Sequence, residues 1–122
     1  MNCAMVILNY RDSERAIKLA LSCAEFKSID KIVLVDNYSK DGSFEKMRKI
    51  TNQKIEVLET FNNGGFAKGN NYGANYIIEK YNSKYIFFAN TDTVFGEKNI
   101  TACLNALEKY PEIGLISTRM KG

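Results

Sequence analysis

The chain has 122 residues, a common length for one domain and long enough to bury a core without disulfide or metal cross-links. Its net charge of +3, from 17 basic and 14 acidic residues, is too small and too scattered to indicate binding to nucleic acid. The sequence contains no histidine, which excludes a histidine-based catalytic triad and a histidine metal site.

Short apolar runs alternate with helical patterns along the chain. An apolar run of four or five residues predicts a strand covered on both faces, whereas apolar residues three or four positions apart predict a helix. In chain order, the predicted elements are a strand at 4–8, a helix at 16–24 that Asp12 or Ser13 can cap, a strand at 32–35, a short helix at 44–50, a strand at 55–58, a helix at about 69–81, a strand at 85–89, a helix at 100–107 and a strand at 113–117. Phe87 and Phe88 are expected to pack beneath helices, and the last helix should stop before Pro111.

Strands that alternate with helices indicate βαβ units, and therefore a mainly parallel sheet of about five strands in an α/β domain. Right-handed crossovers bring the carboxyl ends of all the strands to one edge of such a sheet. In open sheets of this kind, ligands bind outside that edge, near the point where the strand order reverses. The residues at the strand ends are therefore the candidates for function.

Polar residues follow each of the first four predicted strands. These segments are Asn9-Tyr10, Asp36-Asn37, Asn62-Asn63-Gly64-Gly65 and Asn90-Thr91-Asp92. The resulting rim has two carboxylates, and Lys68 is the nearest basic residue in the sequence, so a bare anion is a poor ligand for it. A nucleotide fits better, because Asp36 can accept hydrogen bonds from a base or a ribose. Asp92 can hold Mg²⁺ or Mn²⁺, which share oxygen ligands with phosphates.

Each of these residues also has a purely structural interpretation. A single aspartate after a strand is most often a turn or helix cap, and Asn63-Gly64 is a common turn dipeptide. Gly64, Gly65 and Gly69 match neither the dinucleotide-binding glycine motif nor the lysine-bearing phosphate loop. Tyr10 can be a core aromatic residue with its hydroxyl at the surface. Only the combination of strand ends carries the nucleotide hypothesis.

Several ordered motifs give the sequence a family resemblance. They are VILNYR, IVLVDNYSKDGS, NNGGFAKGNNYGANY, FANTDTVF and YPEIGLIST, and they extend from about Val6 to Thr118. Together they resemble the nucleotide-sugar-binding half of a family 2 glycosyltransferase, closest to the rhamnosyltransferase-like group. The resemblance implies a Rossmann-like GT-A fold, a three-layer αβα sandwich, in which residues 1–122 form one donor-binding domain of a longer protein.

The resemblance also implies roles for individual residues. Those expected to contact the nucleotide of the donor are Asn9, Tyr10, Asp36, Asn63, Gly64, Lys68, Asn70 and Asn90. Asn90-Thr91-Asp92 occupies the place of the D-x-D motif, in which Asp92 coordinates a divalent cation, Mg²⁺ or Mn²⁺, on the diphosphate. Asn90 departs from that motif and adds no charge to the metal site. The implied reaction is an inverting transfer of a hexose or rhamnose from a dTDP- or UDP-sugar to a glycan or lipid-linked acceptor in cell-surface polysaccharide synthesis.

The family's other half binds the acceptor and supplies the general base, and no residue of this sequence is assigned that role. An alternative interpretation is therefore a non-catalytic nucleotide-sugar-binding module of the same fold. A phosphoacceptor signalling domain of flavodoxin-like fold is a third interpretation. That class needs an acidic pair after its first strand and a lysine after its fifth, whereas this chain has Asn9-Tyr10 and Ser117-Thr118 there.

The remaining expectations concern location and assembly. The three cysteines, Cys3, Cys23 and Cys103, are odd in number and widely spaced, which favours buried thiols in a reducing compartment over disulfides or a zinc site. No apolar run is long enough to span a membrane, and no signal peptide is visible. We expect a cytoplasmic protein whose full-length form can lie against the inner face of the membrane, and an uncovered sheet edge predicts self-association into a homo-oligomer.

Overall fold

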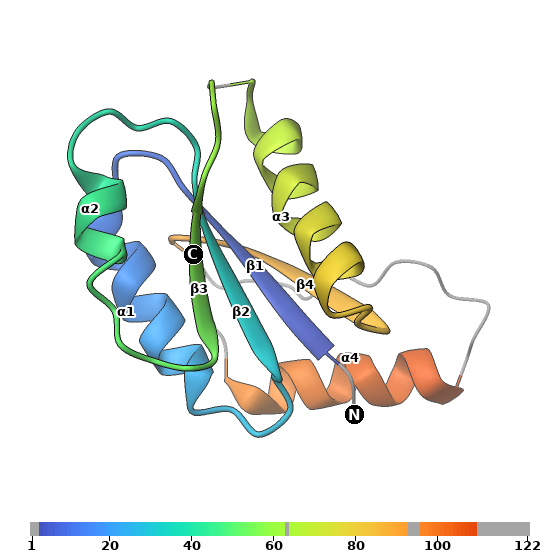
Figure 1. Cartoon of the computed structure of the whole chain (residues 1–122). Coiled ribbons are helices and arrows are strands. Elements are labelled where there is room, and N and C mark those ends of the chain that lie inside the picture. The colour runs from blue at the N-terminus through green and yellow to red at the C-terminus, as the bar shows by residue number, and fades with distance from the viewer. Residues whose placement is uncertain (1–2, 63, 93–95, 110–122) are drawn as a thin grey trace.

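The computed structural model describes residues 3–62, 64–92 and 96–109, which form an α/β fold around a parallel sheet (Figure 1). The four strands are β1 (Cys3–Asn9), β2 (Lys31–Asp36), β3 (Ile55–Glu59) and β4 (Tyr85–Asn90), in the order β3-β2-β1-β4. The helices are α1 (Ser13–Ala24), α2 (Ser43–Met47), α3 (Phe66–Lys80) and α4 (Glu97–Lys109). The predicted α/β fold with a parallel sheet is confirmed, and the strand predicted at 113–117 lies outside the described residues.

Helices cover both faces of the sheet and give three layers. Met5 and Ile7 of β1 belong to a buried cluster with residues of α1 and α4, whereas Val6 belongs to a second cluster with Ile77 of α3. Figure 1 shows α1 and α2 on one side of the strands and α3 on the other. The continuous apolar runs of β1 and β2 arise because both of their faces are buried.

Two glycines allow α3 to lie close to the sheet. A Cβ atom on Gly73 would lie 2.8 Å from Val6 Cγ1 and 3.0 Å from Val35 Cγ2. A Cβ atom on Gly69 would lie 2.5 Å from Leu8 Cδ1. The absence of side chains at these positions therefore fixes the distance between α3 and the ends of β1 and β2.

The parallel register brings the strand ends level with one another. Asn9 pairs with Asp36, Asp36 pairs with Glu59, and Leu8 pairs with Asn90. The chain adds β2 and then β3 on one side of β1, and then places β4 on the other side. The strand order therefore reverses at β1, and the ends of β1 and β4 flank the position where open parallel sheets bind ligands.

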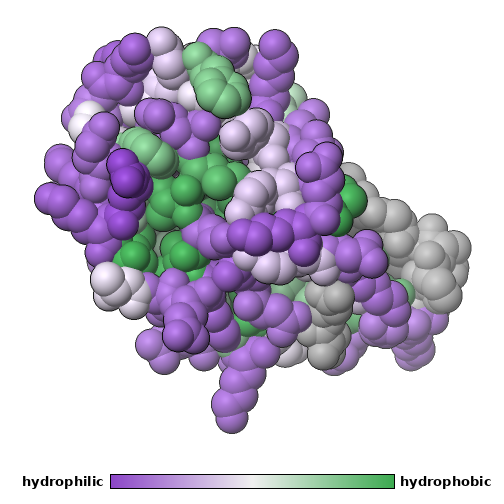
Figure 2. Space-filling view, in the orientation of Figure 1, coloured by the Kyte–Doolittle hydropathy of each residue, from purple (hydrophilic) through white to green (hydrophobic). Residues whose placement is uncertain are grey.

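The two outer strands of the described sheet are less covered than the inner pair. Val57 and Leu58 of β3 are half-buried, and Figure 2 shows hydrophobic residues gathered in the middle of the view, where β3 runs between α2 and α3. The prediction that Phe88 packs beneath a helix is wrong, because its side chain is 51% exposed. Phe88 follows the alternation of β4 onto the α3 face, but α3 packs over β1 and β2 rather than over β4.

Predicted helix boundaries also differ from the structure at α2, α3 and α4, the last of which begins at Glu97 rather than at Ile100. Helix α3 begins at Phe66, three residues before the expected start near Gly69, because Gly65 ends the preceding loop with a φ of 93° and the residues after it are helical at once. Helix α2 ends at Met47 rather than at Ile50. The Ile50 amide donates to the Met47 carbonyl at 3.1 Å, so the chain tightens into i→i+3 turns after the helix.

All three cysteines are buried free thiols, as expected. Burial raises the pKa of the Cys3 thiol to about 12 and that of Cys23 to about 11, so both stay protonated at neutral pH. Among the described helices, none combines the length and the apolar character that crossing a bilayer requires.

Candidate functional site

Asp36, the last residue of β2, is held inside the rim by three hydrogen bonds. Its Oδ1 accepts from Asn9 Nδ2 at 3.0 Å and from Ser39 Oγ at 2.5 Å, and its Oδ2 accepts from the Ser39 amide at 3.3 Å. The residue is only 1% exposed. A carboxylate has about four acceptor positions, so Oδ2 retains the capacity for one further bond. The orientation of Asp36 is thus fixed before any ligand arrives.

The loops that follow β1 and β2 are tied to each other. The Arg11 amide donates to Ser39 Oγ at 2.8 Å, and Arg11 Nε donates to the Ser39 carbonyl at 3.1 Å. Arg11, Tyr38 and Lys40 all have positive φ angles, of 57°, 59° and 58°. Such angles cost energy in non-glycine residues and persist where the surroundings enforce them, often at functional sites. The first two strand ends therefore form one rigid unit.

A second link joins this unit to the end of β4. Asn9 Oδ1 accepts from the Asp12 amide at 3.0 Å, and Asp12 Oδ2 accepts from Thr91 Oγ1 at 2.8 Å. Asp12 stands at the N-cap position of α1, as predicted, but its side chain makes no capping hydrogen bond. The Asp12 carboxylate instead holds the turn that contains Asp92.

The residues of that turn face outward to different degrees. Asp92 is exposed immediately after β4, and Asn90 is half-buried as the last residue of the strand. Tyr10, which follows β1, is 48% exposed, and the Arg11 guanidinium lies 5.4 Å from the centre of its ring. Tyr10 is therefore a surface aromatic residue at the rim and not a core residue.

Helix α3, on the opposite face of the sheet from α1, contributes two further candidate residues, Asn70 and Lys68. Asn70 Oδ1 is buried and has no hydrogen-bond partner in the described part of the chain. Buried acceptors of this kind are costly unless a ligand or water satisfies them. Lys68 lies across Gly64, because a Cβ atom on Gly64 would overlap the Lys68 side chain. Asn63, the remaining expected contact in this loop, lies outside the described residues.

The family model "Glycosyl transferase family 2" matches residues 5–122. The chain belongs to glycosyltransferase family 2. It is also similar to the low-salt glycan biosynthesis hexosyltransferase Agl10 of Haloferax volcanii, with 26% identity over 117 residues that cover 96% of this chain and 36% of that protein. The chain thus spans little more than a third of the length of that relative.

The family implies a divalent cation, and the oxygen atoms at the rim suit a cation that takes most of its ligands from a bound substrate and from water. Among residues 3–62, 64–92 and 96–109, no group of three or more cysteine, aspartate or glutamate residues is placed to hold a metal. A protein cage for a cation is therefore absent from this part of the family 2 domain. The exposed Asp92 carboxylate nevertheless suits a hard cation that takes its other oxygen ligands from a diphosphate and water.

Sequence reasoning named the strand-end residues but missed the side chains that hold them. Ser39, Arg11 and Asp12 were not expected at the site of this family 2 domain. The bond between Arg11 and Ser39 joins residues 28 positions apart, and the bond between Asp12 and Thr91 joins residues 79 positions apart. Two bonds are local, because Ser39 is three residues from Asp36 and Asp12 is three residues from Asn9, and at such spacings polar side chains commonly bond neighbouring groups.

Proposed function

We propose that this family 2 domain binds a nucleotide-diphosphate sugar, linked to UDP or dTDP, at the carboxyl edge of its sheet. The observation that carries the proposal is the continuous hydrogen-bonded chain from Ser39 through Asp36, Asn9 and Asp12 to Thr91. This network holds the ends of β1, β2 and β4 in one arrangement beside the exposed Asp92. A preorganised polar rim lowers the ordering cost that a flexible donor would otherwise meet on binding.

The proposal assigns different parts of the donor to different strand ends. Asp36 and Tyr10 contact the base and ribose, and Asn70 Oδ1 offers an unpaired acceptor to a ligand hydroxyl or amide. Asp92 holds Mg²⁺ or Mn²⁺ on the diphosphate, where the cation neutralises the charge of the leaving group. Asn63, Gly64, Lys68 and Asn90 complete the contacts proposed for the nucleotide, and Asn9, which is fully buried, acts on the donor by holding Asp36 in place.

The wider reaction follows from family membership and is also part of the proposal. We infer an inverting transfer of a hexose or rhamnose to a glycan or lipid-linked acceptor, in the synthesis of a cell-surface polysaccharide. The Haloferax volcanii relative, described as a hexosyltransferase of glycan biosynthesis, supports the hexose. The three free thiols favour a reducing, cytoplasmic compartment for the reaction.

Calorimetric titration of the chain with UDP and with dTDP, each with and without MnCl₂, tests the proposal. We expect Mn²⁺ to strengthen binding of at least one nucleotide, and Asp92→Asn to remove that increase without lowering the thermal midpoint. Asparagine serves as a turn cap about as well as aspartate, so a purely structural Asp92 would tolerate the change. Glu79→Gln is the control, because it alters an exposed carboxylate at the C-terminal end of α3, away from the strand ends.

Two outcomes would overturn the proposal. The first is the absence of measurable binding of either nucleotide, with or without the cation. The second is an equal response to Mn²⁺ in the wild type and Asp92→Asn, which would remove Asp92 from the metal site.

A further inference from the structure

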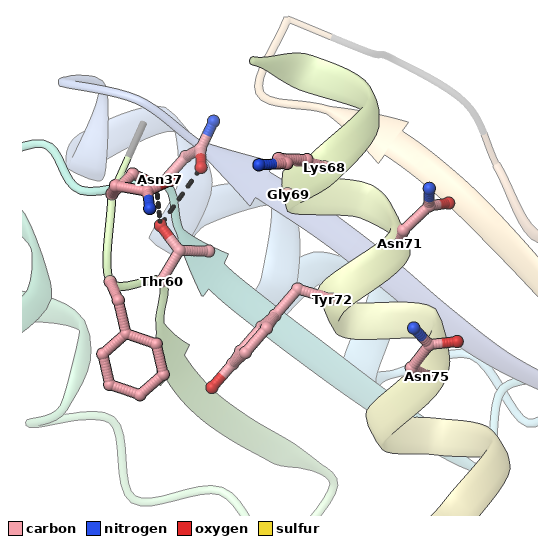
Figure 3. A pocket seen from close by; sticks show the side chains of 9 residues that line it. Asn37, Thr60, Lys68, Gly69, Asn71, Tyr72 and Asn75 are labelled. Carbon is pink, nitrogen blue, oxygen red and sulfur yellow. Dashed lines mark hydrogen bonds between the residues drawn. The ribbon is translucent and has the colours of Figure 1, made fainter. Parts of the chain in front are cut away.

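A hollow outside the rim network lies between the end of β3 and helix α3 (Figure 3). Its volume is about 280 Å³. The lining residues are Asn37, Thr60, Phe61, Asn62, Lys68, Gly69, Asn71, Tyr72 and Asn75. In Figure 3, Lys68 and Tyr72 point from α3 toward the end of β3, and Thr60 and Asn37 lie opposite them. None of the network residues lines this hollow, neither Ser39 and Asp36 nor Asn9, Asp12 and Thr91.

An exposed aromatic pair forms one side of the hollow. Phe61 is 84% exposed, and the centre of its ring lies 6.5 Å from that of Tyr72 at an interplanar angle of 90°. Tyr72 is itself 36% exposed. An aromatic ring this exposed contributes little to the core, and such rings, surrounded by polar groups, commonly mark binding sites. The face of the Phe61 ring is therefore available to a ligand.

The remaining lining groups are mostly neutral hydrogen-bonding groups. Asn62, Asn71 and Asn75 are exposed amides, each with both donor and acceptor atoms. At the base of the hollow, Thr60 Oγ1 donates to Asn37 Oδ1 at 3.1 Å. Among the described residues that line the hollow, none is a carboxylate, and Lys68 supplies the one positive charge. This composition suits an uncharged ligand rich in hydroxyl groups, since a hydroxyl also donates and accepts.

We propose that this hollow binds one pyranose ring of a neutral glycan. The carbon–hydrogen face of the ring stacks on the aromatic pair of Phe61 and Tyr72. The amides of Asn71 and Asn75, one helical turn apart on α3, lie on the far side of Tyr72 from Thr60 (Figure 3) and bond hydroxyls of the same ring or of the next sugar in the glycan. The volume of about 280 Å³ lies at the lower end of the range for ligand pockets, which suits a ligand as small as one sugar ring. The edge-to-face geometry of Phe61 and Tyr72 also leaves no parallel-sided slot between the two rings for a base.

The location connects this hollow with the donor site without making the two depend on each other. Lys68 lines the hollow and is also one of the residues proposed to contact the nucleotide, so a glycan seated here lies directly beside the rim. The proposal goes beyond donor binding and gives the chain a contact with the glycan acceptor. Asp92 is not part of the hollow, so Asp92→Asn should leave glycan binding unchanged.

Saturation-transfer difference NMR with maltotriose, cellotriose and lactose at millimolar concentrations tests the proposal. We expect at least one sugar to receive saturation, strongest at the ring protons of one residue. Phe61→Ala should weaken binding at least fivefold, and Asn75→Ala should weaken it severalfold, while both variants keep their thermal midpoints because both side chains are exposed. Phe88→Ala removes another exposed aromatic residue, on β4, and should change nothing.

Three results would overturn the proposal. The first is the absence of saturation transfer to any of the three sugars. The second is equal sugar binding by the wild type and Phe61→Ala. The third is displacement of the sugar by UDP and Mn²⁺ in direct competition, which would assign the hollow to the nucleotide instead. Because Asp92→Asn affects only the nucleotide titration, failure of donor binding and failure of glycan binding are distinguishable.

Discussion

Thr91→Val tests whether the link from β4 to the first two strand ends supports the metal site. The substitution keeps the shape of the side chain and removes the hydroxyl that donates to Asp12 Oδ2 at 2.8 Å. A hydrogen bond to a charged group contributes about 1.5–3 kcal/mol when buried. The Asp12 side chain is 34% exposed, so water can replace the lost donor, and we expect a loss of about 1 kcal/mol. For a domain of this size, that loss lowers the thermal midpoint by about 4 °C.

The same substitution should affect the donor site selectively. If the whole contribution of about 1 kcal/mol serves to hold the Asp92 turn, the Mn²⁺-dependent affinity for UDP or dTDP falls by at most about fivefold. The affinity without metal should not change, because Asp36 and Tyr10 keep their positions. Thr101→Val is the matched control, since within the described part of the chain the Thr101 hydroxyl bonds backbone carbonyls of its own helix α4 and no side chain. An unchanged thermal midpoint together with an unchanged response to Mn²⁺ would refute the reasoning, as would an equal loss of affinity with and without the cation.

Two further predictions concern the scaffold. Gly73→Ala gains about 1 kcal/mol of helix propensity, but its new Cβ meets the stiff, fully buried side chain of Val6 at 2.8 Å. Overpacking costs about 1–3 kcal/mol, so urea unfolding should show a net loss of stability, whereas a gain would mean that α3 can move away from the sheet. Burial raises the pKa of Glu56, but hydrogen bonds from Lys80, Tyr81 and Tyr76 outweigh it and hold the pKa below its ordinary value. The stability gained from ionised Glu56 is therefore complete above about pH 4.5 and is lost as the pH falls through the lowered pKa. The difference in unfolding free energy between wild type and Glu56→Gln should accordingly shrink in acid. A difference that does not depend on pH would contradict this.

The sequence predicted the elements that depend on local patterns. The apolar runs of β1 and β2 are continuous because both faces are covered, and this pattern alone indicated inner strands of a parallel sheet. The same rule failed for Phe88, since an aromatic residue in an apolar run looks the same whether or not a helix covers it. Which strands α3 covers depends on the direction of the helix and on its close contact with the sheet at Gly73. Neither property can be recognised in the sequence of β4.

The candidate site divides in the same way. The positions of Asn9, Asp36 and Asp92 followed from strand ends, which a sequence can reveal. The use of Asp12 did not, because aspartate before a helix is an ordinary cap and only the folded chain brings Thr91 to it. The aromatic pair of Phe61 and Tyr72 was also invisible, since the loop after β3 has to fold back against α3 before the two rings meet.

The topology constrains how a donor can lie on the rim. Asp36 ends β2 and Asp92 follows β4, and these two strands flank β1. Neighbouring strands are about 4.8 Å apart, so the two ends are separated by about 10 Å across the sheet. A nucleoside diphosphate that places its base on the β2 side can reach the β4 side with its phosphates, and its ribose then crosses the end of β1.

Asn9 occupies that central position, with its amide nitrogen bonded to Asp36 and its amide oxygen bonded to the backbone amide of Asp12. Its side chain is consequently held in the network. We therefore expect Asn9 to act on the donor by positioning Asp36 and Asp12, and not through a direct contact. Asn9→Asp should then place a second carboxylate against buried Asp36 and weaken nucleotide binding whether or not Mn²⁺ is present. A variant that loses only the Mn²⁺-dependent part of the affinity would contradict this arrangement and would put Asn9 with the metal instead.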